Sequence, residues 1–102
     1  MKPDIPHAVW RTCAGLVEAE QILPSSYRQA ISNAEQVIGQ NFSPSSQARA
    51  NLIEAVKLNF VNRKEWPFEL LRRRYSLPIS YNAFGREKKK FCFALAKELG
   101  LL

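Results

Sequence analysis

The sequence predicts a single all-α domain of about five helices. Apolar residues recur at spacings of three and four positions, which is the period of an amphipathic helix. Serine and proline residues that start or stop helices stand between these stretches. The chain has no Asn-Gly or Asp-Gly hairpin turn and no sustained alternation of β-branched residues. With 102 residues, of which 46% are hydrophobic and 24% charged, it can form one hydrophobic core.

The first helix is predicted from Pro6 to Ile22. Proline fits a first helical turn because its missing N–H would have no partner there. Pro24 prevents continuation, since a proline pushes the preceding residue out of the helical region. The apolar face of this helix consists of Val9, Trp10, Cys13, Leu16 and Val17.

Serine residues mark the starts of the next two helices. A serine hydroxyl can accept a hydrogen bond from an unpaired N–H of the first turn. One helix is therefore expected to begin at Ser25 or Ser26 and to stop at Gly39, a residue type common after helix ends. Another is predicted from Ser43, followed by a proline, to about Asn62. The two apolar stripes are Tyr27, Ile31, Ala34 and Ile38, and then Ala48, Leu52, Ile53, Val56 and Phe60.

Residues 63–102 predict a short helix, a proline-containing turn and a longer basic helix. The short helix opens with Pro67 and runs to about Arg74, Pro78 breaks the chain, and Ser80 caps a last helix that runs to about Leu99. This order suits a helix-turn-helix, whose second helix enters the major groove of DNA. The apolar positions of the last helix are Phe84, Phe91, Cys92, Leu95 and Leu99.

The expected core follows from these stripes, and its larger part should come from the first three helices. The residues predicted to be mostly buried are Trp10, Leu16, Ile53, Val56, Phe60, Phe84, Phe91 and Leu95. Aromatic residues are frequent in the basic half, and at helical spacing we expect them in the core. They are Trp66, Phe68, Tyr75, Tyr81, Phe84, Phe91 and Phe93. Phe93 is the exception, because it lies about 200° from Phe91 on a helical wheel and should be exposed or part of an interface.

The positive charge is confined to one half of the chain. Residues 1–50 hold four basic and four acidic groups, whereas residues 51–102 hold eleven basic and five acidic groups, which accounts for the whole net charge of +6. Such asymmetry favours a polyanionic partner. We therefore distinguish a neutral helical half, residues 1–62, from a basic half, residues 63–102.

The basic half supplies candidate contacts to duplex DNA. Arginine can read guanine and asparagine can read adenine at base edges, while lysine suits phosphates. The candidate nucleic-acid contacts are Arg72, Arg73, Arg74, Asn82, Arg86, Lys88, Lys89 and Lys90. A different interpretation remains open, in which these charges only form the solvated face of an amphipathic helix.

Enzymatic patterns are nearly absent, and we expect no enzyme, no cofactor and no metal site. The single histidine, His7, stands near one end, and the four glycines form no phosphate-binding loop. Cys13 and Cys92 have no metal-ligand spacing and are expected to be reduced thiols of a cytoplasmic protein. The sequence predicts neither a signal peptide nor a membrane span, and hence no membrane partner.

Three segments of the basic half resemble a known family. Residues 66–71 (WPFELL), 77–84 (LPISYNAF) and 88–101 (KKKFCFALAKELGL) are similar to the ends of small Firmicute phage proteins grouped with the ArpU- and RinA-type late transcription regulators. The resemblance implies a helix-turn-helix DNA-binding phage regulator in the cytoplasm of a bacterial host, with Asn82, Arg86, Lys89 and Lys90 as DNA contacts. The alternative is a non-enzymatic phage assembly, adaptor or host-interaction protein that binds a protein partner or forms a homo-oligomer.

Overall fold

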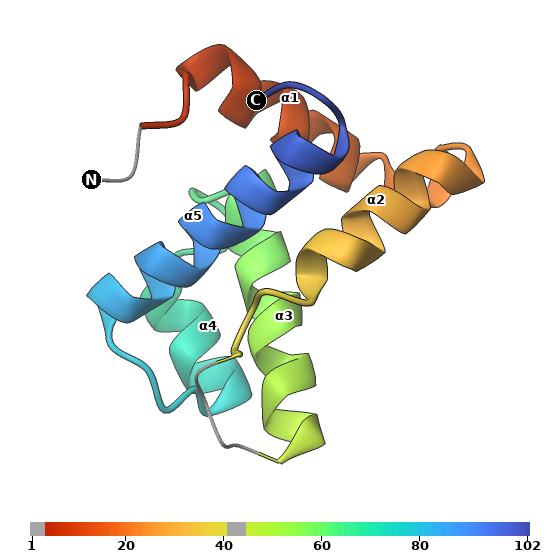
Figure 1. Cartoon of the computed structure of the whole chain (residues 1–102). Coiled ribbons are helices and arrows are strands. Elements are labelled where there is room, and N and C mark those ends of the chain that lie inside the picture. The colour runs from red at the N-terminus through yellow and green to blue at the C-terminus, as the bar shows by residue number, and fades with distance from the viewer. Residues whose placement is uncertain (1–3, 41–44) are drawn as a thin grey trace.

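The computed structural model describes residues 4–40 and 45–102, and this part of the chain confirms the predicted all-α class (Figure 1). It contains five α-helices, one short 3₁₀ helix and no strand. The α-helices are α1 (His7–Glu18), α2 (Ser25–Glu35), α3 (Ser46–Val61), α4 (Phe68–Tyr75) and α5 (Tyr81–Glu98), and the 3₁₀ helix is η1 (Glu20–Ile22).

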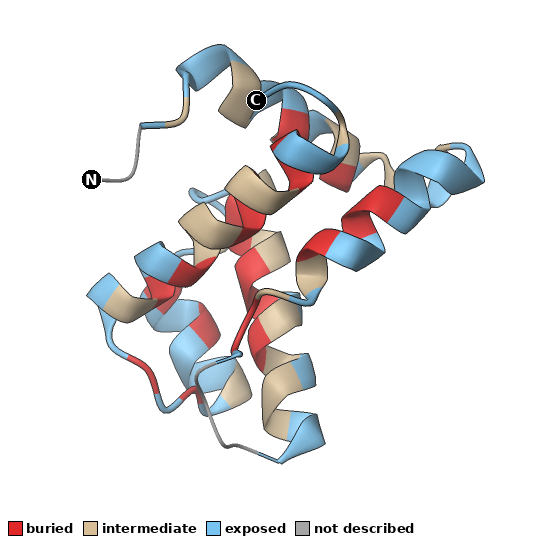
Figure 2. Cartoon of the chain, in the orientation of Figure 1, coloured by how far each residue is buried: buried red, intermediate tan, exposed pale blue. Residues whose placement is uncertain are grey.

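Helix α5 organises the packing. It lies against α1, α2 and α3, most extensively against α2, while α4 packs on α3. The buried residues of each helix face this common interior (Figure 2). The expected larger share of the first three helices is small: residues 1–62 supply ten of the described buried hydrophobic residues, and the basic half supplies nine. Its buried hydrophobic residues are Phe68, Leu71, Leu77, Ile79, Phe84, Phe91, Cys92, Leu95 and Ala96.

The helix starts agree only in part with the expected caps. Ser80 caps α5 as predicted, and its Oγ accepts a hydrogen bond of 3.1 Å from the N–H of Ala83. Ser45 caps α3 in the same way, with a 3.2 Å bond from the N–H of Ala48; the predicted cap Ser43 lies outside the described residues. Prolines occupy the cap position of α1, α2 and α4. Pro24 takes the place of the expected serine cap because its extended backbone already turns its carbonyl toward the first turn of α2.

The helix ends show where proline and glycine act. The first helix stops at Glu18, and the 3₁₀ helix η1 replaces its predicted last turn. Pro24 forces Leu23 into an extended conformation, so the residues just before Leu23 form a short 3₁₀ helix, which is narrower than an α-helix. Gly39 has a φ of +73° and closes the turn that follows α2. A φ of +52° at Ser76 ends α4 before the break at Pro78.

The burial predictions are confirmed for Val56, Phe60, Phe84, Phe91 and Leu95. Trp10, Leu16 and Ile53 are partly buried, and Trp10 and Ile53 pack against the core.

Among the aromatic residues, Phe68, Phe84 and Phe91 are in the core as expected, and Trp66 and Tyr75 are partly buried. Tyr81, at the first position of α5, is 69% exposed, contrary to expectation, although its ring lies 5.7 Å from that of Phe68. Phe93 is partly buried, with the Lys97 ammonium 5.6 Å from its ring centre.

Candidate nucleic-acid interface

The outer face of α5 presents three of the predicted contact residues. Asn82 and Arg86 are exposed, and the side chain of Lys89 is 41% exposed. Their spacings of four and three place them on one face of the helix, within about 60° of each other at 100° per residue. The opposite face is held in the core by Phe84, Phe91 and neighbouring residues. The α5 stripe, defined as Asn82, Arg86 and Lys89, is therefore presented by a fixed helix.

Arg86 and Lys89 have few competing contacts. Arg86 forms no hydrogen bond or ion pair within the described residues. Lys89 lies 3.3 Å from Asp4, whose side chain is 98% exposed. An ion pair between such exposed groups contributes little, typically about 0–1 kcal/mol. Both cations are thus available to a partner from solvent.

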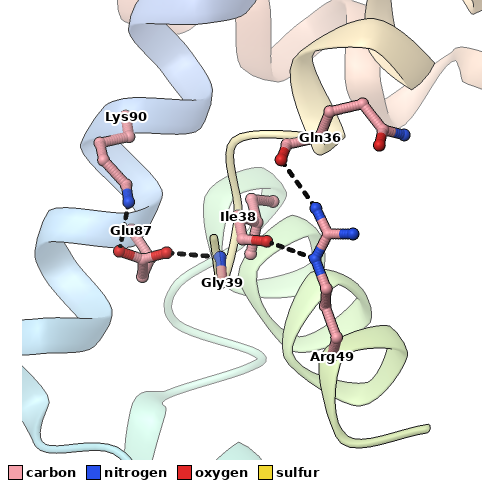
Figure 3. A network of polar contacts seen from close by, with 6 residues as sticks. All are labelled: Gln36, Ile38, Gly39, Arg49, Glu87 and Lys90. Carbon is pink, nitrogen blue, oxygen red and sulfur yellow. Dashed lines mark hydrogen bonds and ion pairs between the residues drawn. The ribbon is translucent and has the colours of Figure 1, made fainter. Parts of the chain in front are cut away.

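Lys90 is used inside the fold instead. Its Nζ lies 2.8 Å from Oε2 of Glu87, whose side chain is only 9% exposed (Figure 3). The other oxygen of Glu87 accepts a hydrogen bond of 2.6 Å from the N–H of Gly39. From the other side of this turn, Arg49 donates to the carbonyl oxygens of Ile38 and Gln36, at 2.9 and 2.7 Å. Lys90 therefore neutralises a buried carboxylate that joins α5 to the turn after α2.

Lys88 also points toward the protein. Its Nζ donates a 2.7 Å hydrogen bond to Oδ1 of Asn59 on α3 and lies 5.9 Å from the centre of the Trp10 ring. Burial lowers the pKa of this ammonium, and the positive charge of Arg63 lowers it further. Lys88 thus does not share the solvent-facing surface of the α5 stripe.

The arginine triplet lies at the far end of α4. All three residues are exposed. Arg72 donates a 3.0 Å hydrogen bond to Glu69, and Arg74 lies over the rings of Trp66 and Tyr75, at 5.4 and 6.0 Å. Arg73 has no ion pair or hydrogen bond within the part of the chain that the structure describes.

The contact between α4 and α5 involves the first turns of both helices. The ring of Phe68 lies 5.0 Å from that of Phe84 and 5.7 Å from that of Tyr81. The arginine triplet follows Phe68 by four to six residues, or about 6–9 Å along the axis of α4. α4 packs mainly on α3 rather than along α5. The helix-turn-helix character of this pair therefore stays a prediction.

Other kinds of site find little support in the described residues. They contain no group of three or more His, Cys, Asp or Glu side chains placed to hold a metal ion. Cys13 and Cys92 are free and fully buried, and the neighbouring thiol of Cys13, together with burial, raises the pKa of Cys92 well above its ordinary value. Across residues 4–40 and 45–102, every helix is too short or too polar to cross a bilayer.

Sequence reasoning missed two basic residues that extend the charged surface. Lys97 continues the outer face of α5 about one turn beyond Phe93 and is exposed. Arg63 lies two residues after the end of α3 and influences the pKa of Lys88, although it lies 25 positions away in sequence. The helical spacing from Lys89 could have found Lys97, but only the packing of α3 against α5 reveals the role of Arg63.

Comparisons of the chain with protein-family models, curated proteins and solved structures give no match. The resemblance of the basic half to phage late regulators therefore remains an expectation from its sequence pattern.

Proposed function

We propose that this protein binds duplex DNA as a small phage or prophage transcription regulator, with α5 as the helix that enters the major groove. The observation that carries the proposal is the α5 stripe: a base-reading pair, Asn82 and Arg86, next to a lysine on the outer face of a helix whose other face is buried. With 18 residues, α5 is about 27 Å long, and an α-helix fits the groove, which is about 12 Å wide.

The residues of this surface have separate roles. Arg86 and Asn82 read base edges, because their forked donors and acceptors match guanine and adenine. Lys89 and Arg73 contact phosphates, as do Arg72 and Arg74 after giving up weak local contacts. Lys88 and Lys90 do not belong to the α5 stripe, because their ammonium groups point to Asn59 and Glu87.

Fluorescence anisotropy with a selected preferred duplex and a random duplex, each at two salt concentrations, tests the proposal. Lys89→Ala should weaken binding to both duplexes and reduce the slope of log K against log salt by about 0.9. Arg86→Ala should cost about 1–3 kcal/mol on the preferred duplex and much less on the random one. Arg28→Ala is the matched control, since Arg28 is an exposed arginine on α2. Unchanged binding by both Arg86→Ala and Lys89→Ala refutes a recognition role for α5.

A second candidate function is a protein adaptor or assembly component. It is favoured by the corner between η1 and α2, where Ile22 is 86% exposed and Tyr27 is 41% exposed. Large exposed apolar side chains that lie close together are typical of protein-binding surfaces. An adaptor would form a complex of fixed stoichiometry with a protein partner, and Ile22→Ser would dissociate it while DNA binding stayed unchanged.

A further inference from the structure

A pocket of about 330 Å³ lies where the end of α3 meets the first turns of α4 and α5. Arg63 and Lys88 line one part of it, together with Asn59 and Asn82. Phe68, Phe84 and the exposed Tyr81 supply apolar surface. Its volume is at the lower end of the range for small-ligand sites, about 300–1,000 Å³.

The charges in this pocket are unbalanced. Two cations face the same space, and its lining contains no carboxylate. Lys88 is partly buried, and the nearby charge of Arg63 disfavours its ammonium form. Positive charges held together without a counter-ion attract an anion, because an anion offsets both their repulsion and their loss of hydration.

The pocket also retains free hydrogen-bond donors. A lysine ammonium has three donors, and Lys88 donates one of them to Asn59. Arg63 forms no hydrogen bond or ion pair with any described residue, and its guanidinium offers a planar fork that matches phosphate oxygens. The amide of Asn82 adds further donors at the mouth of the pocket.

We propose that this pocket is a phosphate-binding site in which Arg63 and Lys88 hold the phosphate oxygens. The phosphate group belongs either to a small phosphorylated molecule that occupies the pocket or to the backbone of bound DNA. Phosphate binding here does not require base reading by Arg86, since neither Arg86 nor Lys89 lines the pocket, although Asn82 belongs to both surfaces.

Titrations monitored by ¹⁵N–¹H NMR test the site with three probes: inorganic phosphate, adenosine 5′-monophosphate and a short random duplex. Chloride at matched ionic strength is the background. Saturable shifts around Arg63 and Lys88 with either small probe assign the site to a small phosphorylated ligand. Shifts there with the duplex alone assign it to the DNA backbone. An absence of shifts at these residues with all three probes overturns the proposal.

Variants separate the pocket from general positive charge. Arg63→Gln should weaken binding of the responding probe about tenfold or more, as loss of a charged hydrogen bond does. Arg28→Gln, which removes the same charge from α2, should bind as the wild type. Equal affinities of Arg63→Gln and the wild type overturn the proposal.

Gly85 offers a variant that leaves every charge in place. It lines the pocket, and a Cβ added there would meet no other group within 4 Å. Gly85→Leu should therefore fold, occupy part of the pocket and reduce phosphate binding, whereas undiminished binding would contradict this location. Arg86→Ala should leave the shifts with inorganic phosphate unchanged, so that failure of the DNA proposal and failure of the phosphate site give different results.

Discussion

Replacing Phe91 with alanine should remove a large part of the stability of this fold. The ring is fully buried on α5 and meets Phe60 of α3 edge-on, at 5.5 Å and 85° between the ring planes. Phe60 meets Trp10 of α1 in the same way, at 5.2 Å and 74°. The three rings join three helices, so truncation opens a cavity where these helices meet. A loss of this kind costs about 3–5 kcal/mol.

Thermal and urea unfolding, followed by circular dichroism, measure this cost. For a domain of this size each kcal/mol shifts the melting temperature by roughly 4–8 °C, so Phe91→Ala should melt at least roughly 12 °C below the wild type. Phe93→Ala is the matched control on the same helix. Phe93 is only partly buried, and its loss should cost about 1 kcal/mol. Similar melting temperatures for Phe91→Ala and Phe93→Ala would refute the packing described for α5.

Two further predictions concern buried and partly buried carboxylates. Glu87→Ala should lower the free energy of unfolding, measured in urea, by about 1–3 kcal/mol, because it leaves the buried N–H of Gly39 without its partner. A change near zero would show that the bond between Glu87 and Gly39 does not stabilise the turn after α2. Burial raises the pKa of Glu35 above its ordinary 4.5, although Lys57 opposes this. The folded state thus binds this proton more tightly, and wild-type stability should fall relative to Glu35→Gln as pH rises through the raised pKa. A constant difference between the free energies of unfolding of the wild type and Glu35→Gln from pH 4 to pH 7 would contradict this prediction.

Local signals in the sequence predicted much of the fold. Ser80 caps α5 because the cap needs only its own hydroxyl and the following turn. The burial of Phe84 and Phe91 follows from helical spacing within a single helix. The prolines were harder to place, since a proline can stand either at the cap or one position inside the helix. Pro67 proved to be a cap.

The composition of the site depends on contacts between distant segments. Lys88, Lys89 and Lys90 follow one another on the same helix, yet Lys88 binds Asn59 of α3, and Lys90 pairs with Glu87, whose other oxygen binds the distant Gly39. No pattern within residues 80–99 reveals the position of Asn59, which the packing of α3 against α5 determines. The same packing brings Arg63 beside Lys88 and creates the pocket proposed to bind phosphate. Sequence reasoning could identify the basic helix but could not separate its outward lysine from its inward ones.

NMR mapping of the surface that contacts DNA tests the central claim most directly. A ¹⁵N-labelled sample is titrated with duplex DNA at low salt, and the amide shifts are assigned along the chain. We expect the largest saturable shifts at Asn82, Arg86 and Lys89, with the corner around Ile22 and Tyr27 unaffected. Shifts confined to that corner, or no saturable shift on α5, would contradict DNA binding by this helix.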